Sequence, residues 1–166
     1  MHKTKKIVCD TMNLWIDLSI KKLWEVIKIV DIFMLNDEEA LQLTGLNSIA
    51  DAANKLLNSG PSVIVIKKGA KGALLAYNNN HFQIPVFPIE KLVDPTGAGD
   101  SFAGGFIGHL VSHGDDNLIE AVITGSAIAS FTVSDFGVEG LLKATKESVD
   151  SRKNIIRNLM REKNHE

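Results

Sequence analysis

A carboxylate at the entrance of a glycine-rich helix is the clearest chemical feature of the sequence. Residues 94–106 read Asp-Pro-Thr-Gly-Ala-Gly-Asp-Ser-Phe-Ala-Gly-Gly-Phe, which begins as a turn and continues into a helix. The small residues Gly97, Ala98 and Gly99 leave the first-turn N–H groups accessible, and a helix start of this kind favours an anion. Asp100 would repel that anion unless it took part in the chemistry. The combination indicates phosphoryl transfer, with a carboxylate that accepts a hydroxyl proton and amides that hold the transferred charge.

The same segment also has a purely structural interpretation, which the glycine spacing leaves open. Asp and Ser are common in the first turn of helices, and Gly-Ala-Gly can serve as a tight entry with close helix packing. Two familiar phosphate loops are excluded. The third glycine of a dinucleotide-binding G-x-G-x-x-G would fall at Phe102, and no Gly-Lys-Ser/Thr follows for a P-loop.

Length and charge restrict the class of protein. A chain of 166 residues with 45% hydrophobic content is long enough for one globular core, so we expect a single domain over residues 1–166. A net charge of -2 gives no general attraction for nucleic acid or an anionic membrane. Cys9 is the single cysteine, and the N-terminal apolar run breaks at Asp10, too early for a signal peptide. We therefore predict a cytoplasmic protein with neither nucleic-acid nor membrane partners.

The elements that must position the carboxylate follow from hydrophobic periodicity. Strands are predicted at residues 6–10, 31–35 and 62–67, with a hairpin that pairs 73–77 and 81–86. Helices are predicted at residues 14–29, 36–43, 48–57, 99–113, 118–134 and 146–161. Strand and helix alternate in the βαβ pattern of a layered α/β domain, whose ligands bind beyond the carboxyl ends of the strands.

Residues 94–106 closely resemble the C-terminal signature of the ribokinase-like (PfkB) carbohydrate kinases. Residues 36–39, Asn-Asp-Glu-Glu, resemble the Asn-x-x-Glu motif of this family, and residues 65–72 resemble its strand and glycine turn over the nucleotide. Residues 10–15 are similar to the strand-end segment before Asn-x-x-Glu in some members. The resemblance implies a three-layer α/β fold with a mostly parallel sheet and helices on both faces.

The resemblance also implies a reaction and its central residues. The implied enzyme is a kinase that transfers phosphate from ATP to a hydroxymethyl group of a sugar or nucleoside. Asp100 matches the base that deprotonates the acceptor hydroxyl. The matching anion hole is formed by Gly97, Ala98 and Gly99.

A second set of matched residues belongs to the nucleotide side. Asn36 and Glu39 match residues that organise Mg²⁺ and the ATP phosphates, usually through water. Lys67, Gly69 and Gly72 match the nucleotide-side turn, and the family often has threonine at the position of Lys67. The matches beside adenine are Gly125, Ser126 and Gly137.

Each of these assignments has a structural alternative. Asn36 and Glu39 have the spacing of a capping box, in which both side chains satisfy helix N–H groups. Lys67 at a strand end can simply be solvated. Asp94 is expected to cap the turn, although the resemblance also allows it to help place a monovalent cation.

The main departure from the family lies at the N-terminus. No Gly-Gly and no Asn-rich substrate motif precedes Met12, so the chain resembles an ATP-side half without the N-terminal strands, the lid and most acceptor contacts. A strand at residues 7–9 would then expose an open edge, which predicts a homo-oligomer or a complementary N-terminal half. Two alternatives to an active kinase follow: a catalytically incompetent nucleotide-binding fragment, or a protein-interaction subunit.

Overall fold

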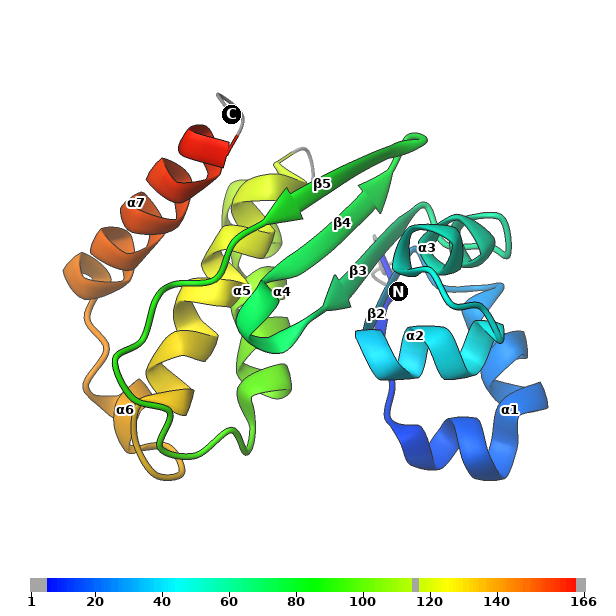
Figure 1. The fold of residues 1–166 in the computed structure, drawn as a ribbon, viewed down its shortest axis with the longest axis horizontal. Helices are drawn as coiled ribbons and strands as arrows, with labels where there is room; N and C mark the ends of the chain where they lie inside the picture. Colours follow the sequence, from blue (N-terminus) through cyan, green and yellow to red (C-terminus); the bar gives the residue numbers. More distant parts are fainter. Residues whose placement is uncertain (1–5, 115–116, 164–166) are drawn as a thin grey trace, which may run out of the picture. The chain divides into compact units, whose positions relative to one another are not determined.

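The computed structural model describes residues 6–114 and 117–163. The elements, in chain order, are β1 (Val8–Asp10), α1 (Asn13–Ile27), β2 (Ile32–Asn36), α2 (Asp37–Thr44), α3 (Ile49–Leu57), β3 (Val63–Lys67), the 3₁₀ turn η1 (Gly69–Lys71), β4 (Ala73–Tyr77), β5 (Asn80–Ile84), α4 (Ala98–His113), α5 (Leu118–Val133), α6 (Glu139–Leu142) and α7 (Lys146–Lys163) (Figure 1). They form two compact units. Of the described residues, the strand unit comprises 6–69 and 73–82, and the helical unit comprises 70–72, 83–114 and 117–163.

One mixed sheet holds the strands in the order β1-β2-β3-β4-β5. The first three are parallel, as the βαβ pattern predicts, and β4 is antiparallel to β3. Asn78 and Asn79 join β4 to β5 with φ values of 50° and 59°, the left-handed conformation that two-residue hairpin turns require. The predicted hairpin is confirmed. In the described part of the chain, β1 pairs with β2 alone and forms an edge of the sheet.

The core of the strand unit lies between three strands and helices α1, α2 and α3. Alternate strand residues point into this core, namely Phe33, Leu35, Ile64, Ile66, Leu74 and Ala76. The intervening residues of β2 and β3 are also buried. Residues 63–66 show no polar alternation, because this strand is buried on both faces.

Helix α1 differs from its prediction. It ends at Ile27 rather than residue 29, and Ser19 leaves helical geometry with φ -147° and ψ 34°. Serine is prone to this because its hydroxyl competes with the helical hydrogen bonds. Several large apolar side chains of α1 and its flanks remain exposed: Met12, Leu14, Trp15, Leu18, Ile20, Val26 and Ile29.

In the helical unit, α4 and α5 pack through glycines. A Cβ placed on Gly125 would lie 2.7 Å from the Phe102 carbonyl oxygen, and one on Gly105 would lie 3.0 Å from the Gly125 Cα. Larger residues at these positions would force the helices apart. Helix α5 carries buried residues along its whole length, as an interior helix does. The sequence pattern missed the short helix α6.

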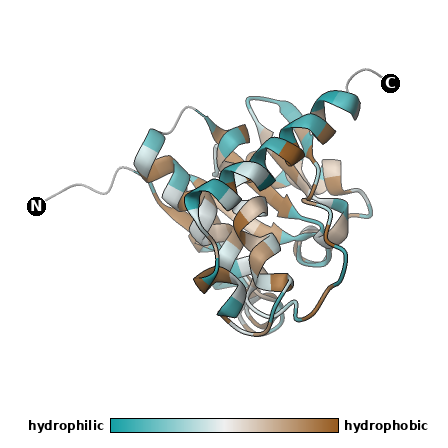
Figure 2. Cartoon of the chain, turned by 90° about the vertical axis from the view of Figure 1, so that its left-hand side faces the viewer, coloured by the Kyte–Doolittle hydropathy of each residue, from teal (hydrophilic) through white to brown (hydrophobic). Residues whose placement is uncertain are grey.

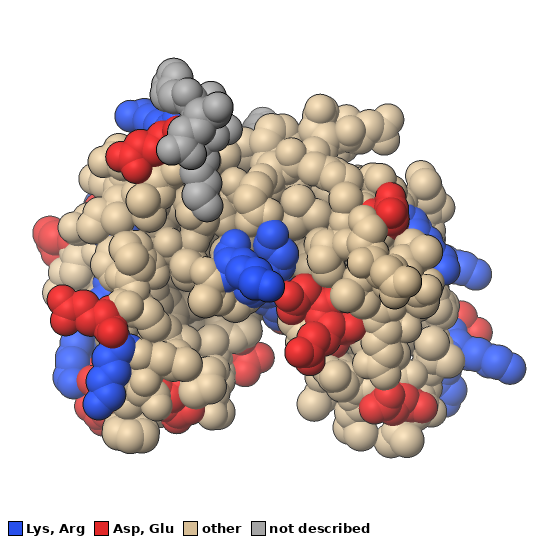
Figure 3. Space-filling model, viewed as in Figure 1, with Lys and Arg blue, Asp and Glu red and all other residues tan. Residues whose placement is uncertain are grey.

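Helix α7 is amphipathic, and Figure 2 shows hydrophilic and hydrophobic residues alternating along the helix that leads to the C-terminus. Arg157 of α7 forms a bidentate ion pair with Glu120 of α5, with nitrogen–oxygen distances of 2.6 and 2.7 Å. These hydrogen bonds lower the pKa of Glu120 below its ordinary value. Acidic and basic groups are interspersed over the face that Figure 3 draws. None of the helices in the described ranges is long and apolar enough to cross a bilayer.

Candidate active site

The start of α4 has the geometry of an anion-binding helix terminus. Gly97 precedes the helix with φ 76° and ψ 2°, a left-handed conformation that favours glycine. The Ser101 N–H donates to the Gly97 carbonyl at 2.9 Å and closes the first turn. No side chain from the described residues caps this turn. The Ala98 N–H donates to the Pro95 carbonyl at 3.2 Å. Among the described residues, the other first-turn amides of α4 are open to an acceptor from outside the helix, with the exposed carboxylate of Asp100 beside them.

Asp94 stabilises the segment that leads into this turn. Its carboxylate accepts from the Thr96 N–H at 2.9 Å. This bond, with further hydrogen bonds from the Thr96 hydroxyl and the Gly137 N–H, lowers the pKa of Asp94 below its ordinary value. The expected capping role is confirmed. The alternative role toward a monovalent cation stays a prediction.

The C-terminal part of α5 fixes the same segment at two more points. The Val93 N–H donates to the Val133 carbonyl at 2.9 Å, just before the turn. The buried Thr132 hydroxyl donates to the Ser101 hydroxyl at 2.7 Å, inside the first turn of α4. Sequence reasoning missed both contacts because nothing in the sequence pairs these positions. The uncapped turn is thus positioned by tertiary contacts behind it.

The residues predicted beside adenine also lie in the helical unit. Gly125 and Ser126 are buried in α5, and Gly137 follows that helix with φ 55°. Close packing against Phe102 explains why position 125 requires glycine without any ligand. Their proximity to a nucleotide stays a prediction.

Three polar residues stand at the carboxyl ends of the three parallel strands of the strand unit. Asp10 ends β1, Asn36 ends β2 and Lys67 ends β3, with Asn36 and Lys67 directly paired in register. The Lys67 Nζ lies 2.5 Å from the Asp10 Oδ2, and the side chains are 17% and 28% exposed. Asp10 was not among the predicted site residues. The signal that could have found it is its position, since carboxyl ends of parallel strands meet at one edge.

Asn36 and Glu39 form the capping box that their spacing allows. The Glu39 N–H donates to the Asn36 side-chain oxygen, and the Asn36 N–H donates to the Glu39 carboxylate, both at 2.8 Å. Glu39 is only 4% exposed, and this burial raises its pKa, against the lowering effects of the Asn36 N–H and of Lys67. A carboxylate already engaged in this way fits a contact to Mg²⁺ through water better than direct ligation.

The nucleotide-side glycines have conformational reasons of their own. Gly69 begins η1 and Gly72 follows it, with φ values of 53° and 85°. A Cβ on Gly72 would lie 2.1 Å from the Ile84 carbonyl oxygen, closer than any packed atom allows. Both positions therefore require glycine for the turn itself.

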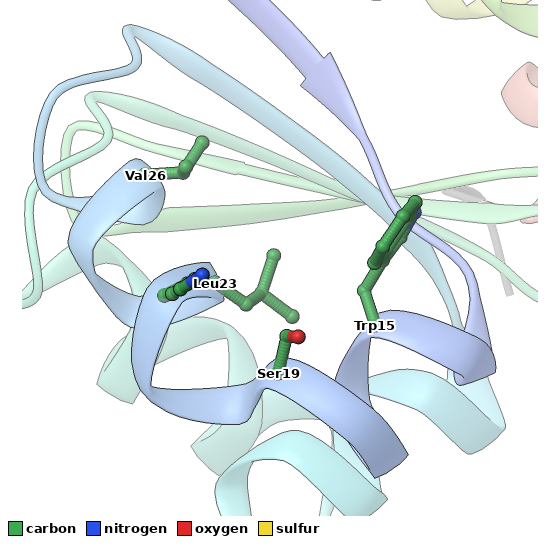
Figure 4. Close-up of a pocket in the computed structure, with 5 residues that line it drawn as sticks. Trp15, Ser19, Leu23 and Val26 are labelled. Carbon is green, nitrogen blue, oxygen red and sulfur yellow. The ribbon is translucent and has the colours of Figure 1, made fainter.

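The predicted residues fall into two sets. Asn36, Glu39 and Lys67 come together at the strand ends of the strand unit, whereas residues 97–100 and the adenine-side positions belong to the helical unit. Within the described residues, no group of three or more His, Cys, Asp or Glu side chains could hold a metal ion. An open pocket on α1, lined by Trp15, Ser19, Lys22, Leu23 and Val26, contains no predicted site residue (Figure 4).

Comparison with known proteins decides the family. The family model of the pfkB family carbohydrate kinases matches residues 2–144. The chain belongs to the pfkB family. Its fold is accordingly a ribokinase-like α/β fold, represented here by part of its elements.

The relatives of this pfkB family member include sugar and nucleoside kinases. It is 39% identical over 110 residues to the cytidine kinase of Thermococcus kodakarensis, covering 63% of this chain and 39% of that one. It is 30% identical over 128 residues to the ribokinase of Staphylococcus aureus, covering 74% and 41%. The Arabidopsis thaliana ribokinase, solved with ribose and ATP, superposes with a TM-score of 0.68 at 27% identity, covering 78% and 43%. The chain thus spans about two fifths of the length of these relatives.

Proposed function

We propose that this pfkB family chain is the ATP-side module of a kinase that phosphorylates a hydroxymethyl group of a sugar or nucleoside. One observation carries the proposal: the uncapped start of α4 leaves backbone amides open next to an exposed carboxylate. A helix start that merely ended a turn would gain stability from a side-chain cap, as α3 does from Ser48 and α5 from Asn117. In the proposal, an external anion accepts the hydrogen bonds that a side-chain cap would otherwise accept.

The proposed chemistry assigns one task to each group at this turn. Asp100 accepts the proton of the acceptor hydroxyl while the hydroxyl oxygen bonds to the γ-phosphorus of ATP and the bond from that phosphorus to the ADP oxygen breaks. The backbone amides of Gly97, Ala98 and Gly99 stabilise the charge on the transferred phosphoryl group. ATP as the donor is supported by the Arabidopsis ribokinase, which was solved with ATP and ribose.

The strand ends would serve the nucleotide. In the proposal, Asn36 and Glu39 organise Mg²⁺ and the phosphates through water, and Mg²⁺ supplies charge neutralisation when bound. The turn at Lys67, Gly69 and Gly72 approaches the phosphates. Gly125, Ser126 and Gly137 are proposed to border adenine.

The second candidate is a chain that binds nucleotide without turnover, or a protein-interaction subunit. The edge position of β1 and the exposed apolar side chains of α1 suit either a second copy of the chain or a complementary N-terminal half.

The test uses the complete 166-residue chain. Thermal denaturation with and without MgATP measures nucleotide binding, and ADP release with a panel of pentoses, hexoses and nucleosides measures transfer. The proposal predicts stabilisation by MgATP and acceptor-dependent ADP release. Asp100→Asn should reduce the turnover rate by at least about 10³-fold and leave the MgATP-induced stabilisation intact.

Each alternative has its own signature in this test. Stabilisation by MgATP without ADP release from any acceptor would favour the nucleotide-binding fragment. No response to MgATP would favour the interaction subunit. Full turnover by Asp100→Asn would refute the assignment of the base. Sedimentation velocity across a range of concentrations tests the oligomer, and a monomer at every concentration would contradict self-association.

A further inference from the structure

The strand unit contains an ion pair at the strand ends, where the proposed function places the nucleotide phosphates. Lys67 from the end of β3 contacts Asp10 from the end of β1, across the end of β2. We propose that Asp10 is an internal substitute for phosphate, which holds Lys67 in the absence of nucleotide and releases it to the phosphate chain of MgATP. This inference rests on the proposed function and explains how Lys67 is held in position before nucleotide binds.

The geometry of Asp10 suits a holding role. Its Oδ1 accepts from the Thr11 N–H at 2.9 Å, so the carboxylate is fixed to the backbone and its Oδ2 faces Lys67. Lys67 keeps a 17% exposed side chain and therefore remains accessible to an incoming anion. Because Asp10 is fixed and Lys67 is accessible, a stronger acceptor can replace the Asp10 carboxylate as the partner of the Lys67 ammonium group.

The surrounding charges make the exchange favourable. The charged groups that act electrostatically on one another here are Asp10 from β1, Lys67 from β3 and Glu39 from α2. Lys67 is the one cation of these three groups, shared by two carboxylates. A triphosphate carries several charged oxygens and offers an ammonium group more acceptors than one carboxylate does. The cost of the exchange is the loss of the Asp10 contact, which is modest because the pair is partly exposed.

This arrangement predicts opposite effects for its two members. Asp10→Asn removes the competing charge and should tighten MgATP binding about 2- to 5-fold, the range expected for a partly exposed ion pair. Lys67→Met removes the phosphate contact and should weaken MgATP binding about 10-fold or more. In the double variant the Asp10→Asn gain should be smaller than in the wild-type background, because the competition for Lys67 is gone and only the direct repulsion between Asp10 and the phosphates is relieved.

Isothermal titration of the full chain with MgATP, and in parallel with adenosine, tests the proposal. All variants should bind adenosine equally, since it lacks phosphate. Lys28→Met is the matched control: it removes an exposed lysine of the same unit, located between α1 and β2, and should leave both affinities unchanged. Circular dichroism verifies folding, and Lys67→Gln replaces Lys67→Met if the latter unfolds.

The outcomes separate this inference from the proposed function. A wild-type chain that does not bind MgATP overturns both. Wild-type binding with no loss in the Lys67 variant overturns the inference alone. A weaker affinity in Asp10→Asn also overturns the inference, because it would make Asp10 a ligand. So does a gain from Asp10→Asn that is undiminished in the double variant.

Discussion

Helices α2 and α4 both begin with a carboxylate in the first turn, but their N-termini are stabilised in opposite ways. At α2, Asn36 and Glu39 satisfy the helix start reciprocally with hydrogen bonds between residues three apart. At α4, no side chain of the described residues caps the turn, and Asp100 remains exposed. The start of α4 is held instead by contacts from α5, through Thr132, Val133 and the following Gly137.

This difference separates a structural helix start from a candidate reactive one. A capping box satisfies two backbone donors internally, here the N–H groups of Asn36 and Glu39, and so leaves fewer amides for a ligand. The start of α4 has no side-chain cap and uses only the Ala98 amide locally, in a hydrogen bond to the Pro95 carbonyl, but its position depends on residues distant in the sequence. The two starts should therefore respond to different substitutions, and the following predictions test that difference.

The largest effect is expected from Gly125→Ala in α5. The added Cβ would lie 2.7 Å from the Phe102 carbonyl oxygen and push α4 away from α5. We expect a loss of about 2–3 kcal/mol in the free energy of unfolding, measured by urea denaturation. Gly104→Ala is the matched control, because no atom lies within 4 Å of its added Cβ, and it should be neutral or stabilising by up to about 1 kcal/mol. Equal effects of the two variants would contradict the role assigned to α5.

At α2 the sensitive positions are local. Asn36→Ala removes the side-chain acceptor for the Glu39 N–H and should lower the free energy of unfolding by about 1 kcal/mol in the absence of nucleotide. Asn36→Asp keeps an acceptor and should retain most of that stability. If the alanine variant were as stable as the wild type, the capping box would not stabilise α2.

A smaller effect is expected from Thr132→Val, which preserves shape and removes the hydrogen bond to Ser101. The loss should be about 0.5–1 kcal/mol, with faster hydrogen exchange at the first-turn amides of α4. Thr132→Ser retains the hydroxyl and should restore slow exchange. Unchanged exchange in the valine variant would show that α5 does not hold this turn.

The smallest effect concerns His109, near the C-terminal end of α4. The side chain is 7% exposed, and its pKa is lowered first by burial and then by His113 and Lys153. In the unfolded state His109 has its ordinary pKa of about 6.5, so between that pH and the lowered folded-state pKa the unfolded state binds more protons. The stabilisation from neutral His109 is therefore complete above about pH 6.5 and is lost as the pH falls through the folded-state pKa. The Tm should fall by no more than about 3 °C between pH 7 and pH 5.5 from this group. His109→Phe should remove that part of the pH dependence, and an identical profile would refute it.

The sequence predicted most elements because their signals are local. Continuous apolar runs mark β2 and β3, Ser48 supplies a local cap for α3, and the paired asparagines after Tyr77 specify the hairpin. The missed break at Ser19 and the missed α6 have weaker patterns, since a single serine and a four-residue helix produce no periodicity. The candidate residues of the site were named from motifs, and Asp10 was not, because an ion pair between residues 57 apart depends on strand register.

By itself the sequence determined the elements, the family and the chemical types at the site: a glycine turn, a carboxylate and a strand-end lysine. Tertiary structure alone decided that Lys67 meets Asp10, that Thr132 holds Ser101, and that Gly125 is required by the crossing of two helices. The physical reason is the range of the interactions. Caps and turns join residues a few positions apart, whereas these three contacts depend on how strands align and helices cross.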